Sequence, residues 1–211
     1  MNAISKKPLN EIVPEYNSRF IPVKKYFWDR IKYSVILGRL KNGYKILDVG
    51  CGIGYLLEEV QRRHNCECYG IDTNVNIKNL SIPDCTFEVS DVARLTFADK
   101  FFDVVFAMDT LEHIENCEPA IKQIHRVLKD DGSLIVVGPT ETFFYKLCRF
   151  MLKGTFSEEG GPGAGEHHHT IYTLEKIITA MGFTAEKKLY LPRYFPTFLS
   201  GVKIIRYRKT N

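Results

Sequence analysis

A short apolar segment followed by a glycine-rich turn constrains this chain more than any other feature. Residues 45–49 predict a buried strand, residues 50–54 a turn with three glycines, and residues 55–63 a helix. Glycine adopts backbone angles that other residues avoid and lets a ligand approach the main chain closely. Strand, turn and helix together predict a cradle for a nucleotide-like ligand, with free N–H groups at the start of the helix.

The spacing of the glycines distinguishes between kinds of nucleotide cradle. A dinucleotide fingerprint, G-x-G-x-x-G, would need a third glycine at the position of Tyr55. The chain instead carries D-x-G-x-G-x-G from Asp48 to Gly54, which disfavours a dehydrogenase. This motif resembles the first motif of the class I S-adenosylmethionine (SAM) dependent methyltransferases, and later landmarks of that family follow in the same order.

Beyond the turn, the chain alternates between apolar strands and amphipathic helices. Further strands are predicted at 67–72, 85–89, 102–107, 133–139, 183–191 and 202–207, and helices at 26–40, 118–128 and 173–182, the last with Thr173 as its cap. The alternation predicts an α/β doubly wound sheet. The resemblance implies a Rossmann-like sheet of seven mostly parallel strands, in the order 3-2-1-4-5-7-6 with the seventh antiparallel. We expect one domain over residues 1–211.

The resemblance also implies the cofactor and its contacts. SAM would be bound and S-adenosylhomocysteine released as product. Asp72, at the tip of the second strand, is expected to accept hydrogen bonds from the ribose hydroxyls, and Asp91 from the adenine amino group, although Asp91 could instead cap a helix. The predicted cofactor-binding residues are Asp48, Gly50, Cys51, Gly52, Gly54, Tyr55, Asp72, Thr73, Asp91, Val92 (through its N–H), Met108 and Asp109.

The loop after the fourth strand supplies the candidate catalytic residue. In the family that the chain resembles, this loop faces the methyl donor, so His113 is the candidate general base; the alternative is a histidine that only packs on a helix. The adjacent residues His167 to His169 are second candidates. No metal is expected, because consecutive histidines seldom point at one ion, whereas catalytic zinc prefers three ligands set by fold geometry.

Two segments lie outside the regular alternation. Residues 1–42 form an N-terminal arm with a helix that either covers the cofactor or packs on the sheet. Residues 140–170 are an insertion after the fifth strand, apolar and aromatic at first and glycine-rich from Gly160 to Gly165. We expect a lid that encloses an apolar or lipid-linked acceptor or touches a membrane surface; the alternatives are a dimer interface or an extra core helix.

Composition narrows the partners. A net charge of +4 is too small to indicate nucleic acid, and the four cations in residues 201–211 favour a solvated edge strand over a binding patch. Six cysteines without a C-x-x-C pair indicate reduced thiols in a cytoplasmic protein, and no apolar run reaches the ~18 residues of a membrane span. We expect methyl transfer to a hydroxyl, amine or carbon of a small-molecule or lipid-like acceptor; the alternative is a non-catalytic SAM-binding or partner-binding protein.

Overall fold

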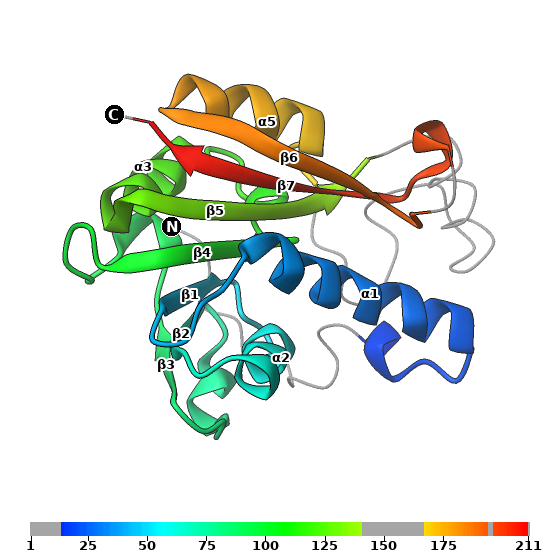
Figure 1. Ribbon diagram of the computed structural model, residues 1–211, viewed down its shortest axis with the longest axis horizontal. Helices are drawn as coiled ribbons and strands as arrows, with labels where there is room; N and C mark the ends of the chain where they lie inside the picture. The colour runs from blue at the N-terminus through cyan, green and yellow to red at the C-terminus, as the bar shows by residue number, and fades with distance from the viewer. Residues whose placement is uncertain (1–13, 141–166, 194–195, 211) are drawn as a thin grey trace.

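The structure is a computed structural model that describes residues 14–140, 167–193 and 196–210 (Figure 1). Within these residues, seven strands form one sheet in the order β3-β2-β1-β4-β5-β7-β6. The strands are β1 (Lys45–Val49), β2 (Glu67–Asp72), β3 (Cys85–Val89), β4 (Phe102–Met108), β5 (Leu128–Pro139), β6 (Phe183–Leu191) and β7 (Val202–Lys209). β1 to β5 pair in parallel, and β7 is antiparallel to both β5 and β6. The predicted fold class, strand order and orientation of the seventh strand are confirmed.

Helices cover both faces of this sheet, as a doubly wound fold requires. They are α1 (Ile21–Gly38), α2 (Tyr55–Arg63), α3 (Glu118–Val127) and α5 (Ile171–Ala180). Successive residues of a strand point to opposite faces, so Ile46 of β1 joins the core cluster beneath α1 and α2, and Leu47 joins the cluster beneath α3 and α5. Both side chains are fully buried.

Parallel strands place their carboxyl ends along one edge of the sheet. Short 3-10 helices lie in the loops that leave these ends: η3 (Val75–Asn79) after β2, η4 (Val92–Arg94) after β3 and η5 (Leu111–His113) after β4. A further 3-10 turn, η2 (Pro14–Asn17), precedes α1, and η6 (Thr197–Leu199) precedes β7. The loops at the carboxyl ends are where the fold can build a site.

Several predicted boundaries are wrong by a few residues. α1 begins at Ile21, with Pro22 in its first turn, because proline is tolerated where the N–H has no partner in the helix. α5 begins at Ile171, and its cap is Thr170, whose hydroxyl accepts a hydrogen bond from the Thr173 N–H. β5 begins at Leu128, five residues earlier than predicted, across a register shift opposite β4.

The predicted solvated edge strand at 201–211 is also wrong. β7 lies between β5 and β6, and Lys203 and Lys209 are only 2% and 7% exposed. Each has a carboxylate partner: Lys203 Nζ lies 2.5 Å from Glu175, and Lys209 Nζ lies 3.6 Å from Asp130 and also donates to the Leu128 carbonyl at 2.9 Å. Lys203 and Lys209, which the sequence suggested to be solvated, are therefore buried side chains of an interior strand.

The N-terminal arm both packs on the sheet and approaches the carboxyl edge. The second half of α1 buries Val35 and Leu37 in the core, and the Arg206 guanidinium of β7 donates to the last carbonyls of the helix, those of Leu37 and Gly38, at 2.9 and 2.8 Å. Residues 1–13 of the arm, and residues 141–166 of the predicted lid, lie outside the described residues. Across the described residues, no helix is both long and apolar enough to cross a membrane.

Candidate functional site

The glycine turn between β1 and α2 has the backbone that its sequence predicts. Gly50, Gly52 and Gly54 all have positive φ, at 73°, 51° and 79°, which a residue with a side chain rarely adopts. The N–H groups of Gly50 and Cys51 donate to the Ile71 carbonyl at 2.8 and 2.9 Å, which ties the turn to β2. Gly54 then begins α2 without a side-chain cap. The turn therefore presents main chain rather than side chains at the carboxyl edge.

Asp72 lies directly beside this turn. Its Oδ2 accepts a hydrogen bond from the Gly52 N–H at 2.9 Å, and its Oδ1 accepts from the Asn74 N–H at 2.8 Å. Each carboxylate oxygen has two lone pairs, so both retain capacity to accept from a ligand. The next residue, Thr73, is half-buried in the loop that follows. The structure thus brings Asp72 to the glycines, as the sequence predicts, and leaves its role toward a ribose as a prediction.

Asp48 is a carboxylate buried at the same place. Its side chain is 3% exposed, and its Oδ1 has no hydrogen-bond partner among the described residues. Burial, and secondly the neighbouring charge of Asp72, raises the pKa of Asp48 well above its usual value. Burying a carboxylate without a partner costs free energy. A ligand that supplies a hydrogen-bond donor or a positive charge to this oxygen would remove that cost.

Aromatic side chains from the N-terminal arm close one side of the turn. The Tyr16 ring lies 5.2 Å from the Tyr55 ring, centroid to centroid, and Trp28 lies 5.1 Å from Tyr55. The Trp28 indole N–H also donates to the Tyr16 carbonyl at 3.3 Å. Tyr55 was predicted as a site residue. Trp28 was not, although the single tryptophan of the chain, in a helix near aromatic residues, was a signal that could have found it.

The exit of β4 lies at the same edge of the sheet, because β4 runs parallel to β1 and next to it. Asp109 adopts a left-handed backbone (φ 51°) and forms an ion pair with the buried Arg30 of α1. Met108, just before it, packs against the core on the α1 side. The sequence predicted Met108 and Asp109 but not Arg30, because a charged residue within a helix gives no sign of burial.

Asp91 and Val92 lie at the exit of β3. The Ser90 N–H donates to the Asp72 carbonyl at 3.0 Å, which sets this loop beside the tip of β2. Asp91 caps η4, since its Oδ1 accepts from the Ala93 N–H at 2.9 Å, and the Val92 side chain is buried in the core. The cap is therefore present, and a contact of Asp91 with adenine would have to use its remaining lone pairs.

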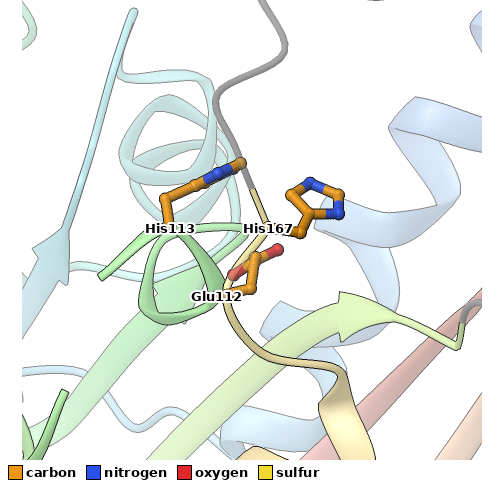
Figure 2. A group of neighbouring side chains, drawn as sticks. All are labelled: Glu112, His113 and His167. Carbon is orange, nitrogen blue, oxygen red and sulfur yellow. The ribbon is translucent and has the colours of Figure 1, made fainter. Parts of the chain in front are cut away.

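A third group of side chains lies where η5 meets the start of α5. Figure 2 shows Glu112, His113 and His167 turned toward a common space. Glu112 is 1% exposed, and the two imidazole centroids are 4.7 Å apart. The sequence named His113 and His167 as alternative bases; the structure brings them together and adds Glu112, which sequence reasoning missed. His168 and His169 are not part of this group: His168 is exposed, and the His169 ring contacts the Glu115 carbonyl at 3.0 Å.

Comparison with known proteins shows which family this chain resembles in sequence. Residues 47–136 match the family model described as a methyltransferase domain. Phosphoethanolamine N-methyltransferase 1 of Triticum aestivum is 30% identical over 154 residues, which cover 68% of this chain and 29% of that protein. Cycloartenol-C-24-methyltransferase of Arabidopsis thaliana is 33% identical over 99 residues, which cover 43% of this chain and 30% of that protein. The chain thus spans about three tenths of the length of these curated relatives.

The solved structures agree on the fold. A SAM-dependent methyltransferase from Methanosarcina mazei superposes with a TM-score of 0.63 at 25% identity, and the match covers 83% of this chain and 97% of that one. The predictions from the glycine motif and the strand order therefore have support from both sequence relatives and structure.

Proposed function

We propose that this chain, which belongs to the class I SAM-dependent methyltransferases, transfers a methyl group from SAM to a hydroxyl, amine or carbon of a small-molecule or lipid-like acceptor. One observation carries the proposal. The glycine turn is fastened to Asp72 by the Gly52 N–H, at the same edge where the buried Asp48 has an oxygen in need of a donor. A cationic nucleoside ligand supplies both a ribose for Asp72 and an ammonium for Asp48.

The residues present fit SAM. Asp72 and Thr73 would hold the ribose, Asp91 and the Val92 N–H the adenine, and Asp48, Met108 and Asp109 the methionine end, with the turn from Gly50 to Tyr55 between them. Burial raises the pKa of the Cys51 thiol, so this side chain would stay neutral beside the bound cofactor. When bound, SAM supplies a methyl group on a positively charged sulfur.

The contribution of the protein is mainly alignment. Holding two reactants in the right geometry can lower a barrier by several kcal/mol, on the order of 7–11 in the best intramolecular cases. The leaving sulfide is neutral and needs no acid. A hydroxyl or ammonium acceptor must lose a proton, and His113, in the loop after β4, is our proposed base.

The relatives support a small-molecule acceptor. Their names state phosphoethanolamine and cycloartenol as acceptors, which differ in polarity but are both small metabolites. We propose the same breadth for this chain: a polar amine or a lipid-like molecule. The five described cysteines are all free, which agrees with our proposal of a cytoplasmic protein.

Two measurements test the proposal. Calorimetry should show SAM binding at one equivalent per chain and no binding of NAD. A mass-spectrometric assay with SAM and a panel containing ethanolamine phosphates and sterols should then show a product heavier by one methyl group. Binding of NAD in preference to SAM would overturn the cofactor; SAM binding without transfer to any acceptor class would favour the non-catalytic alternative.

A further inference from the structure

A mixed cluster of one carboxylate and two imidazoles includes η5, which closely follows Asp109 of the proposed cofactor site. Figure 2 shows its three side chains. One ligand atom from each of Glu112, His113 and His167 lies within 4.8 Å of the other two. Around a tetrahedral zinc ion with bonds of about 2.1 Å, ligand atoms lie ~3.4 Å apart. Binding of such an ion would therefore require the two half-buried imidazoles to rotate toward it.

The backbone on both sides of this cluster is already fixed. The N–H groups of His168 and His169 both donate to the Glu112 carbonyl, at 2.8 and 3.3 Å. The His169 ring contacts the Glu115 carbonyl at 3.0 Å, which adds a third link between the same segments. These contacts hold His167 above Glu112 and His113 without using the three side chains of the cluster, so the ligand set is positioned in advance.

We propose that Glu112, His113 and His167 bind one divalent transition-metal ion. Imidazole nitrogens favour zinc, copper, iron or nickel, whereas magnesium, calcium and manganese prefer oxygen ligands. Two histidines and one glutamate also form a known ligand set of catalytic zinc, in which remaining positions are left for water or substrate. The ion would take an oxygen of the acceptor into these positions; this last step rests on the proposed methyl transfer, whereas the binding of the ion does not.

This assignment differs from the expectation that the chain holds no metal. That expectation concerns three consecutive histidines, and the cluster found here uses only His167 from among them. The assignment also changes the role of His113. An imidazole whose nitrogen holds a metal cannot accept a proton there, so the ion would lower the pKa of a bound hydroxyl in its place.

The chain offers a matched control for the test. His168 is adjacent to His167 and exposed, and it donates its backbone N–H to the Glu112 carbonyl of η5, a contact that alanine retains. The full chain without an affinity tag would be stripped with EDTA and titrated with Co²⁺ by visible absorption, then with Zn²⁺ by calorimetry. Wild type, His167→Ala, His113→Ala, Glu112→Gln and His168→Ala would be compared.

We expect one equivalent of metal per wild-type chain and an unchanged affinity for His168→Ala. His167→Ala and His113→Ala should weaken binding by about 100-fold or more, since loss of outer-shell partners alone costs 10–100-fold. Glu112 is buried, so its variant is interpreted only if circular dichroism shows a native fold; the half-buried histidines do not share this constraint.

Two results would overturn the metal site: no Co²⁺ or Zn²⁺ bound by the wild type, or equal weakening by His168→Ala and His167→Ala. SAM affinity, measured on the stripped chain, is a separate readout. Metal binding that persists in a chain without affinity for SAM would reject the proposed function and leave the metal site standing. SAM binding in a chain that takes no metal would reject the metal site, keep the proposed function, and leave His113 as the proposed base.

Discussion

Arg30 of α1 and Asp109 at the exit of β4 form an ion pair that joins the N-terminal helix to the proposed cofactor edge. Arg30 is buried, with its side chain 7% exposed, whereas the Asp109 side chain is 35% exposed. The Arg30 guanidinium also lies over the Phe27 ring, 5.1 Å from its centroid. The position of α1 over the site therefore depends on a charge that belongs to the site itself.

Asp109→Asn should consequently loosen this joint. Asparagine tolerates the left-handed backbone at this position, so the variant isolates the loss of charge opposite Arg30. Removing one partner of a fully buried pair costs about 3–5 kcal/mol; with Asp109 partly exposed, we expect ~2 kcal/mol by urea denaturation. Asp29→Asn, which breaks the exposed i,i+4 pair with Lys25, is the control and should cost less than ~0.5 kcal/mol. An equal loss of unfolding free energy in the two variants would show that the Arg30–Asp109 pair stabilises the fold no more than an exposed pair does.

Asp72→Ala should weaken SAM binding. The change removes the carboxylate that both orients the Gly52 N–H and is placed to receive the ribose. Loss of a charged hydrogen bond is worth about 1.5–3 kcal/mol, or roughly 10- to 150-fold in Kd by calorimetry. Asp99→Ala, whose side chain is 72% exposed and pairs with Arg126, should bind SAM like the wild type. An unchanged Kd in Asp72→Ala would reject the ribose contact.

Asp48→Asn should stabilise the free protein in a pH-dependent way. Burial, followed by the charge of Asp72, raises the pKa of Asp48, so the folded state holds the proton more tightly than the unfolded state. Stability therefore falls as pH rises above the ordinary value of 3.8 toward the folded-state pKa. The difference in Tm between Asp48→Asn and wild type should be small near pH 3.5 and grow toward pH 7, while SAM binds the variant more weakly.

Asp130 is a control whose pKa is shifted in the opposite direction to that of Asp48. Its hydrogen bond with Lys100 lowers the pKa of this exposed carboxyl, so its stabilising contribution is present above pH 3.8 and is lost as pH falls. Asp130→Asn should accordingly lower Tm slightly at pH 7 and have no effect in acid. If Asp48→Asn gave the same slope as Asp130→Asn, the buried carboxylate would be ionised and satisfied in the free chain.

Gly50→Ala should destabilise the glycine turn through both strain and overlap. The added Cβ would overlap Thr110 Oγ1 and lie 2.7 Å from its Cγ2, at a φ of 73°. Left-handed strain of about 1–2 kcal/mol and overpacking of about 1–3 kcal/mol together predict a loss of ~2–5 kcal/mol in unfolding free energy.

Two further variants separate these contributions. Gly43→Ala has a similar φ of 81° with nothing within 4 Å of the added Cβ, so it should show only the strain. Thr110→Ala in the Gly50→Ala background should remove the overlap and restore part of the stability, giving a coupling energy of ~1–2 kcal/mol in a double-mutant cycle. Additive effects of the two changes would show that the turn relaxes away from Thr110.

The parts of the site that sequence predicts are those encoded locally. The strand at 45–49, the left-handed glycines and the helix from Tyr55 follow from a few adjacent residues, and Asp72 follows from its place at a strand end. The strand order beyond simple alternation came from family resemblance, because neither periodicity nor propensity specifies which strands are neighbours.

The residues that sequence reasoning missed act across the fold. Arg30 looks like a surface residue of a helix until β4 brings Asp109 to it. Glu112 gains its meaning only when the start of α5 sets His167 beside it. The choice of Thr170 over Thr173 as the α5 cap shows the same limit on a smaller scale, since both threonines fit the pattern and only the backbone geometry selects one.

The position of β7 has a consequence for how the sheet opens. Among the strands of the described residues, β6 pairs with β7 alone, and β7 joins it to β5. Detachment of β6 therefore breaks only its pairing with β7. Release of β7 from β5 removes β6 and β7 together and exposes β5 from Ser133 to Pro139. Hydrogen exchange of the amides in β6 and β7 should consequently show that these two strands open as one cooperative unit, distinct from β1 to β4. The pair can then separate from β5 while the proposed cofactor site at β1, β2 and β4 stays folded.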